Sequence, residues 1–307
     1  MRGVGWGAAL VVVALAAPAG AEQKVQASRS ARGDSRVEID VPAGEVRITG
    51  WDKEEVSVSG TLCERATGIS LSGSGRVVRI EVDAEDPHRC PVDLDIRLPR
   101  ASRVQVETHS AGVTAKDLSG TFKGETVAGS MSVTGSLKEA ELATVSGNVE
   151  VSGSVPSVHA EAVNGSVTVK GVGAEVEAST VNGALTVEAG SLNRGRLETV
   201  SGKLSFVGGL LPTASLEVES VSGNVDLAFR GTLDATITVD TFSGRVTSEL
   251  LESHAAGSPA PNAPDADEDD EDLPEREGHS FVFGSGGAEV GVETLSGNVH
   301  LHPAAAK

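Results

Sequence analysis

The sequence predicts an all-β protein, a parallel β-solenoid (β-helix-like) of about 18-residue rungs with an N-terminal β-rich cap. Three observations predict this class. A short cassette, in which an apolar residue precedes Ser, Asn or Ala and then Gly, recurs at a nearly constant step; apolar residues alternate on both sides of it; and helical periodicity is missing after the first 21 residues. The cassette glycines lie at 112, 129, 147, 165, 183, 202, 223, 244 and 297, so the step is 17 to 21 residues until a last step of 53.

The first 21 residues have the composition of an export signal. Arg2 precedes an apolar run over residues 8–17 that is too short to span a bilayer, and Ala19-Gly20-Ala21 fits a cleavage site. The mature chain is then expected to start at Glu22, without a cysteine there for a lipid anchor, and we expect no membrane span further along. We therefore expect a soluble exported protein, periplasmic, secreted or at the cell surface.

Residues 22–100 are predicted to form a β-rich cap on the first rung. Val37 and Ile39 alternate with polar residues, and similar alternation continues through the segment. A cap protects the open edge of a stack from pairing with other chains. The only two cysteines, Cys63 and Cys90, lie here, and an even pair in an oxidising compartment predicts a disulfide, with two buried free thiols as the alternative.

Residues 101–250 hold the regular repeats. In one copy the apolar side of the first strand falls on even positions, such as Leu142 and Thr144, and that of the second strand falls on odd positions, such as Val145 and Val149. This change from even to odd indicates that the chain turns within the cassette, and it groups Val145 with the interior residues of the second strand. Each unit is thus a strand, a tight corner and a strand. Gly at the corner can adopt backbone angles that a Cβ disfavours, and the Ser or Asn before it can hydrogen-bond its own turn. The structural corners are expected at Gly129, Gly147, Gly165, Gly183, Gly202, Gly223, Gly244 and Gly297.

An acidic insertion over residues 251–279 separates the last repeat from the others. Nine acidic residues against Arg276 give a charge of −8 between residues 265 and 277. Because the segment has almost no large apolar side chains, burial cannot offset the entropy lost on ordering, and we expect disorder. Residues 280–302 are expected to form the final rung.

Three stretches resemble a known group of proteins. They are residues 41–52 (VPAGEVRITGWD), the central Val-Ser/Asn-Gly repeats, and residues 284–299 (GSGGAEVGVETLSGNV). Together they resemble the bacterial putative-adhesin family of exported β-strand-repeat proteins, a domain of unknown function. The resemblance covers nearly the whole chain after residue 21, and it implies a surface protein and offers no catalytic residues to carry over. The acidic insertion departs from the compact pattern of the family.

Composition argues against several classes of function. The net charge of −19 disfavours nucleic acid as a partner, because phosphate binding needs a basic surface. Glycan binding by stacking is disfavoured since the chain has no Tyr and keeps only Trp51 after signal cleavage. The repeated Thr could suggest an ice-binding array, but its parity directs it inward, where its hydroxyl would satisfy a backbone group. Glutamates alternate along the strands as a solvated face would, rather than as a catalytic cluster: Glu141, Glu150, Glu161, Glu175, Glu177, Glu198, Glu217 and Glu219.

Metal binding has two weak candidates in the sequence. His300 and His302 share an outward face, and the acidic run around Asp269 and Asp270 could hold Ca²⁺ diffusely. Neither supplies a full set of ligands, so we predict weak cation association and no metal site or cofactor.

We therefore predict a non-enzymatic envelope or surface protein, an adhesin or interaction scaffold for an unidentified envelope or surface ligand, protein or glycan. The edge opposite the cassettes varies in length between repeats, which makes it, with the acidic insertion, the first place to look for binding. Two alternatives remain. One is a carbohydrate-active β-helix enzyme, and the other is a structural element that self-associates.

Overall fold

The computed structural model describes residues 23–86, 89–250 and 277–305. Within these ranges the protein is all-β, and its strands form the repeated rungs of a β-solenoid, which confirms the predicted class. No helix in the described ranges has the length and hydrophobicity needed to cross a bilayer. The expected export signal and most of the acidic insertion, with Asp269 and Asp270, lie outside the described residues. The chain divides into two compact units, Met1–Gly153 and Ser154–Lys307.

In the first unit, stacked rungs form two layers of parallel strands. The strands are β7 (Arg103–Leu118), β8 (Thr121–Ala128), β9 (Met131–Gly135), β10 (Glu139–Ser146) and the start of β11 (Val149–Asn164). Strand β8 lies between the first half of β7 and β10, whereas β9 lies between the second half of β7 and the start of β11. Phe122 and Met131, from different layers, both approach Gly124 in the interior. Alternation of apolar and polar residues thus produces two sheets around one apolar core.

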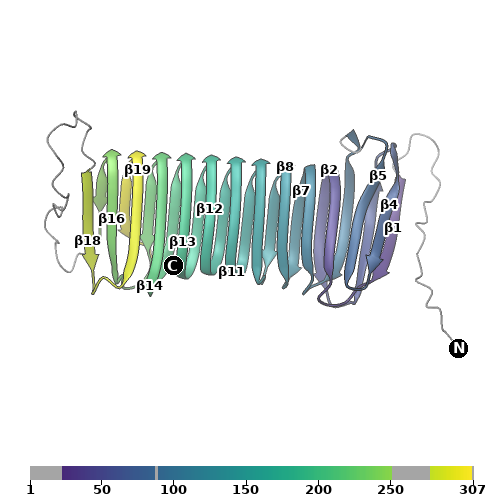
Figure 1. Cartoon of the computed structure of the whole chain (residues 1–307), viewed down its shortest axis with the longest axis horizontal. Helices are drawn as coiled ribbons and strands as arrows, with labels where there is room; N and C mark the ends of the chain where they lie inside the picture. The colour runs from purple at the N-terminus through teal and green to yellow at the C-terminus, as the bar shows by residue number, and fades with distance from the viewer. Residues whose placement is uncertain (1–22, 87–88, 251–276, 306–307) are drawn as a thin grey trace, which may run out of the picture. The chain divides into compact units, whose positions relative to one another are not determined.

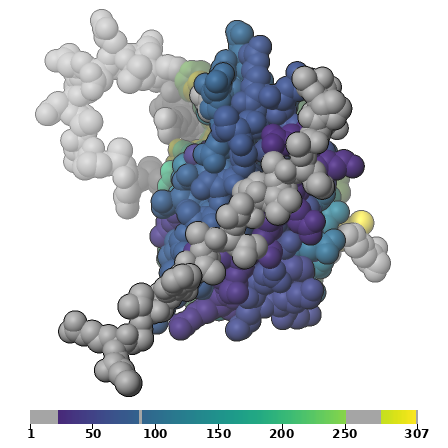
Figure 2. Space-filling model, turned by 90° about the vertical axis from the view of Figure 1, so that its right-hand side faces the viewer, coloured from purple at the N-terminus to yellow at the C-terminus, as the bar shows by residue number. Residues whose placement is uncertain are grey.

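The N-terminal strands complete the first unit. They are β1 (Gln23–Ser30), β2 (Arg36–Trp51), β3 (Glu55–Leu62), β4 (Ala66–Ser74), β5 (Val77–Ala84) and β6 (Val92–Pro99). Strand β2 pairs with β7 in parallel, so it forms a rung of its own. Strands β5 and β6 pair with the two halves of β2, and then β4, β3 and β1 add in antiparallel fashion. The disulfide Cys63–Cys90 is present, as predicted. Figure 2 looks onto this end of the unit, where the purple and blue atoms belong to the N-terminal strands.

The second unit repeats the same two-layer arrangement. Its strands after β11 are β12 (Val167–Asn182), β13 (Leu185–Ser201), β14 (Leu204–Ser222), β15 (Val225–Phe229), β16 (Ala235–Ser243), β17 (Val246–Ser248), β18 (Glu277–Phe283), β19 (Ala288–Ser296) and β20 (Val299–Pro303). Equivalent cassette positions face each other across neighbouring strands, for example Thr180 with Thr199 and Thr199 with Ser220. The register shifts instead near Lys170 and Glu188, where repeats differ in length.

The last rung of the chain is not the last rung of the stack. Strand β19 pairs with both β14 and β16 (Figure 1). Strand β20 pairs with both β15 and β17. Residues 288–303 therefore form a rung between those of Gly223 and Gly244. Strand β18 begins at Glu277 and pairs with the other side of β16 in antiparallel fashion. We call residues 288–303 the intercalated rung.

A turn at residues 284–287 leads from β18 into the intercalated rung. The Oδ1 atom of Asp234 accepts hydrogen bonds from the backbone N–H groups of Ser285 at 2.7 Å and Gly287 at 3.2 Å, and from the Ser285 hydroxyl at 3.0 Å. Gly284 and Gly286 have φ values of 64° and 76°, which glycine adopts readily. Asp234 thereby holds the turn that reverses the chain.

The cassette corners differ from the sequence-based expectation in two ways. Val145 is 45% exposed, because the chain has already turned away from the interior at that residue. The grouping of the cassette valine with the interior was therefore wrong. The polar cassette residues bond to the neighbouring rung rather than to their own turn: Asn182 donates to Asn164 Oδ1 at 3.0 Å, and Ser201 to Asn182 Oδ1 at 2.9 Å.

The corner glycines are required by close packing between rungs. A Cβ on Gly183 would overlap the backbone of Gly165, and one on Gly202 would overlap that of Gly183. Positive φ adds to this requirement at Gly147 and at Gly202, which have values of 151° and 149°. The same overlap occurs at Gly129, Gly223, Gly244 and Gly297, where the backbone itself has no positive φ in the left-handed region.

Candidate functional site

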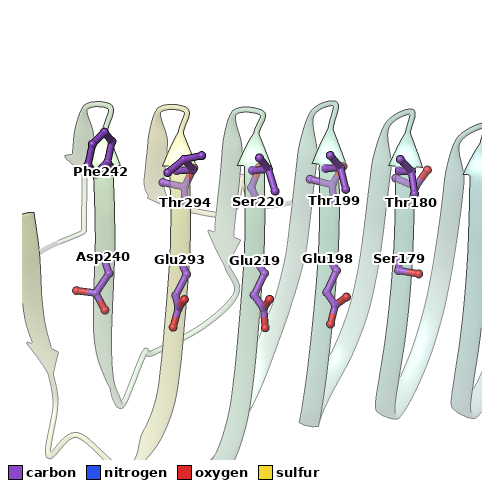
Figure 3. Close-up of a pocket in the computed structure, with 14 residues that line it drawn as sticks. Ser179, Thr180, Glu198, Thr199, Glu219, Ser220, Asp240, Phe242, Glu293 and Thr294 are labelled. Atoms are coloured by element: carbon purple, nitrogen blue, oxygen red, sulfur yellow. The ribbon is translucent and has the colours of Figure 1, made fainter. Parts of the chain in front are cut away.

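An open groove of about 420 Å³ lies beside the cassette corners of the second unit. Strands β12, β13, β14, β16 and β19 line it, and Figure 3 shows their rungs side by side. Because the rungs stack in register, each contributes the same few positions, and the groove is therefore bordered by rows of equivalent side chains. The sequence pattern did not predict this surface, because the repeats vary in length at the opposite edge and keep a constant length here.

The first row is apolar and solvent-exposed. It consists of the residue that follows the buried Thr or Ser in each cassette, and these side chains are 38–53% exposed: Val181, Val200, Val221, Leu295 and Phe242. Single exposed apolar residues are ordinary on a protein surface, but a contiguous row beside a groove is typical of an interaction site. We call these five residues the apolar row.

The second row is acidic. Glu198 faces Glu219, Glu219 faces Glu293, and Glu293 faces Asp240 across successive strands. Paired strands lie about 4.8 Å apart, so the carboxylates repeat at about that interval. Like charges directly opposite each other destabilise a sheet, so a cation beside any of these four carboxylates would offset the repulsion. We call Glu198, Glu219, Glu293 and Asp240 the acidic row (Figure 3).

Cationic side chains neutralise only part of the acidic row. Arg196 contacts Glu198 and lies 3.2 Å from Glu219 and 3.5 Å from Glu217, and the hydrogen bond to Glu198 together with these charges raises the pKa of Arg196. In the described part of the chain, no ion pair involves Glu293 or Asp240. The part of the groove formed by Glu293, Asp240 and the neighbouring Phe242 and Leu295 thus combines uncompensated negative charge with exposed apolar surface.

Buried hydroxyl groups occupy the equivalent cassette position within each unit. The inward orientation expected for the repeated Thr agrees with the burial of Thr126 and Thr144 in the first unit and of Thr180, Thr199, Thr241 and Thr294, together with Ser220, in the second, whereas Thr108 is half-buried. Thr144 donates to the Gly129 carbonyl at 3.2 Å, and Thr180 to the Gly165 carbonyl at 2.8 Å. In contrast, the hydroxyls of Thr199, Thr241 and Thr294 have no partner among the described residues. The expected hydrogen bond from the cassette hydroxyl to a backbone group is therefore present in some rungs only.

The variable edge carries less chemistry. An open depression of about 610 Å³ there is lined by Gly171, Ala189, Gly190 and Arg230 together with Glu188, Gly231, Ala304 and Ala305. The charged group of Arg230 is already engaged, with the Ala189 carbonyl at 3.1 Å and Glu188 at 3.8 Å. Among the described residues that line this depression, no row of like-charged side chains corresponds to the acidic row.

His300 and His302 lie together on the outward face of β20, as their spacing predicts. The structure adds Asp226 from β15 to this pair, and the ligand atoms of the three residues all lie within 4.8 Å of one another. Asp226 carries the same offset from Gly223 that His300 carries from Gly297. That signal was present in the sequence, but it could be used only with the stacking order known.

The fold and groove define a class of protein. Two-layer rungs with glycine corners, a disulfide-linked cap and an exposed apolar row describe a repeat-built β-solenoid domain. The sequence model of the family described as Toastrack DUF4097 matches residues 34–302. The chain belongs to this family.

The chain also resembles solved structures of low sequence identity. None of the curated proteins matches the chain. Among solved structures, a putative adhesin from Bacteroides fragilis is 14% identical with a TM-score of 0.44, covering 67% of this chain and 96% of its own. A putative adhesin from Parabacteroides merdae is 8% identical with a TM-score of 0.36, covering 67% and 92%. A putative cell adhesion protein from Clostridium sporogenes is 10% identical with a TM-score of 0.26, covering 92% and 100%.

Proposed function

We propose that this protein is a non-enzymatic interaction protein of the cell envelope or surface, and that its groove binds an extended basic segment of a partner protein. The observation that carries the proposal is the acidic row running alongside the exposed apolar row. The export signal expected in residues 1–21 supports a location outside the cytoplasm.

Charge complementarity identifies the occupant. Glu293 and Asp240 have no cationic partner in the described part of the chain, so a ligand with Lys or Arg side chains would supply one. The apolar row beside them requires apolar groups from the same ligand, because covering exposed Val, Leu and Phe contributes about 25 cal/mol per Å². A basic peptide with interspersed apolar residues offers both groups, whereas a simple cation offers only the first.

The geometry favours an extended conformation. Side chains of a strand-like peptide alternate between its two sides, so a peptide lying along the groove can direct Lys towards the acidic row and apolar residues towards the apolar row. Five rungs are separated by four intervals of about 4.8 Å, so they span about 19 Å, which is the length of about six extended residues. The proposed ligand is therefore a short segment of alternating basic and apolar residues.

The test uses fluorescence anisotropy with labelled octapeptides. An alternating Lys-Val peptide is expected to bind saturably, and an alternating Glu-Val peptide is not. A block peptide of four Lys and four Val has the same charge but cannot match both rows, so it is expected to bind more weakly. Binding of the alternating peptide should also weaken with added salt, because the contacts are at the surface.

Variants of the protein complete the test. Glu293→Gln combined with Asp240→Asn is expected to weaken binding of the Lys-Val peptide at least about tenfold, which corresponds to about 1.4 kcal/mol. Glu150→Gln is the matched control, since Glu150 is an exposed strand glutamate that does not line the groove. Equal binding of the alternating and block peptides, or an equal effect of the control, would overturn the proposal.

A further inference from the structure

A cluster of metal-ligating side chains lies outside the groove, on strands that follow the cassettes in the second unit. Asp226 is on β15, and His300 and His302 are on β20. Asp226 faces His300 directly across the two strands, and His302 lies two residues further along the same face. All three side chains are half-buried. The intercalated rung brings them together, since its last strand lies directly beside β15.

The three side chains converge on one oxygen atom. Asp226 Oδ1 is 2.9 Å from His302 Nε2 and 3.6 Å from His300 Nδ1. The imidazole rings are stacked, with centroids 4.7 Å apart and 20° between their planes. Ligands bound to one tetrahedral Zn²⁺ at 2.0–2.2 Å are about 3.3–3.5 Å from one another, so small side-chain adjustments would bring these atoms to that spacing.

The hydrogen-bonding capacity of the histidines points to a cation. His302 directs Nδ1 to the Pro303 carbonyl at 3.0 Å and Nε2 to Asp226, and His300 directs Nδ1 to Asp226 and Nε2 to Glu249 at 3.3 Å. Each of the four ring nitrogens therefore faces an oxygen acceptor. A neutral imidazole has a single N–H, so it can satisfy only one of its two contacts. A second proton on each ring, or a metal ion between the rings and Asp226, would satisfy the others, and the zinc titration below distinguishes the two.

Outer contacts orient all three candidate ligands. The nitrogen of His302 that faces away from the cluster can donate to the Pro303 carbonyl, and that of His300 to Glu249. The second oxygen of Asp226 accepts a hydrogen bond from Lys203 Nζ at 2.8 Å. Metal-binding histidines generally donate their other N–H to a carboxylate or a carbonyl in this way. The arrangement thus supplies three ligands and a partner for each.

We propose that Asp226 Oδ1, His300 Nδ1 and His302 Nε2 form a binding site for a divalent transition metal ion, with Zn²⁺ as the best match and a water molecule as the fourth ligand. Two imidazoles and a carboxylate are ligands that Zn²⁺ accepts, whereas Ca²⁺ and Mg²⁺ require oxygen ligands throughout. Because the ligands come from β15 and β20, a bound ion links the intercalated rung to the rung that precedes it in the stack.

The test is a calorimetric titration of the purified protein, without a histidine tag, with zinc chloride at pH 7.5. One ion per chain is expected to bind. His302→Gln and Asp226→Asn should each weaken this binding by more than about 100-fold, beyond the range of outer-contact effects, and Glu249→Gln by about tenfold. Titration with Co²⁺ should give the intense visible absorption of a tetrahedral site, and His302→Gln should abolish it.

A matched control is available within the same unit. His159 also lies between two carboxylates, with Glu161 at 3.0 Å and Glu177 at 3.2 Å, but it has no second histidine beside it. His159→Gln should leave the zinc isotherm unchanged, as should neutralisation of Asp269 and Asp270. In a separate measurement, Zn²⁺ should raise the melting temperature of the unmodified protein, and a chelator should reverse the effect. Absence of saturable binding, or loss of binding with His159→Gln instead of His302→Gln, would overturn the proposal.

Discussion

Gly297 packs against the backbone of Gly223, although 74 residues separate them in the chain. A Cβ on Gly297 would overlap the Gly223 carbonyl, and a Cβ on Gly244 would in turn overlap that of Gly297. The same contact joins Gly202 to Gly183 between consecutive repeats. The intercalated rung therefore makes the same corner contact as its neighbours, and the corner geometry does not depend on the order of the repeats in the chain.

Replacement of a corner glycine should destabilise the fold. Gly202→Ala adds a Cβ that overlaps the Gly183 carbonyl and fixes alanine at a φ of 149°, so we expect a loss of about 2–4 kcal/mol in the free energy of unfolding. Gly291→Ala is the matched control, since a Cβ there meets nothing within 4 Å, and it should be neutral or slightly stabilising. Urea titration of both variants gives the comparison. Equal stability of the two would contradict the role assigned to the corner.

The buried hydroxyls should respond differently to the same substitution. Thr180 donates to the Gly165 carbonyl at 2.8 Å, so Thr180→Val should cost about 1 kcal/mol. The Thr199 hydroxyl is buried without a partner, so Thr199→Val should be neutral or stabilising by up to about 1 kcal/mol. Thermal unfolding of the two variants measures the difference. A loss of similar size in both would show that Thr199 has a partner in solution.

The turn held by Asp234 should make stability depend on pH. Hydrogen bonds from the backbone N–H of Gly287, from the Ser285 hydroxyl and from the Ser285 N–H lower the pKa of Asp234. Because the folded pKa lies below the unfolded one, this contribution is fully present above the ordinary value of about 4 and is lost as the pH falls through the folded pKa. Asp234→Ala should therefore lower the urea midpoint at pH 7, and the difference from the unmodified protein should shrink at acidic pH. A difference that stays constant down to pH 2 would contradict this.

The disulfide should stabilise the cap. Cys63 and Cys90 close a loop with a sequence separation of 27, which corresponds to about 3–4 kcal/mol on the chain-entropy model. Substitution of both cysteines by Ser should lower the free energy of unfolding by that amount. Hydrogen exchange should show the largest loss of protection in β3 and β6, the two paired strands next to the cysteines. Uniform loss over the second unit would argue against a local effect.

The regular part of the fold could be predicted because it follows from local physics. The cassette step, the alternation around Thr144 and the even pair of cysteines indicated stacked rungs, inward threonines and the disulfide. Parity alone could not establish where within the corner the chain turns, so the exposed orientation of Val145 was missed. That single error concealed the apolar row, and with it one side of the groove.

The long-range part could not be predicted from local patterns. Nothing in residues 280–302 indicates that they stack on the rung of Gly223 rather than after that of Gly244, because both arrangements bury the same alternating residues. Two results depend on that order. One is the acidic row, in which Glu293 stands between Glu219 and Asp240, and the other is the position of Asp226 beside His300.

The position of the intercalated rung has a consequence for synthesis. A chain emerging from its N-terminus can stack each rung on the previous one up to β14 and β15, but β16 and β17 cannot take their native places until residues 288–303 have been made. Until then β14 keeps an unpaired edge, which is the kind of surface that recruits other chains. Loss of residues 288–303 would therefore leave the edge of β14 open between the rungs of Gly223 and Gly244, so completion of the second unit requires these residues.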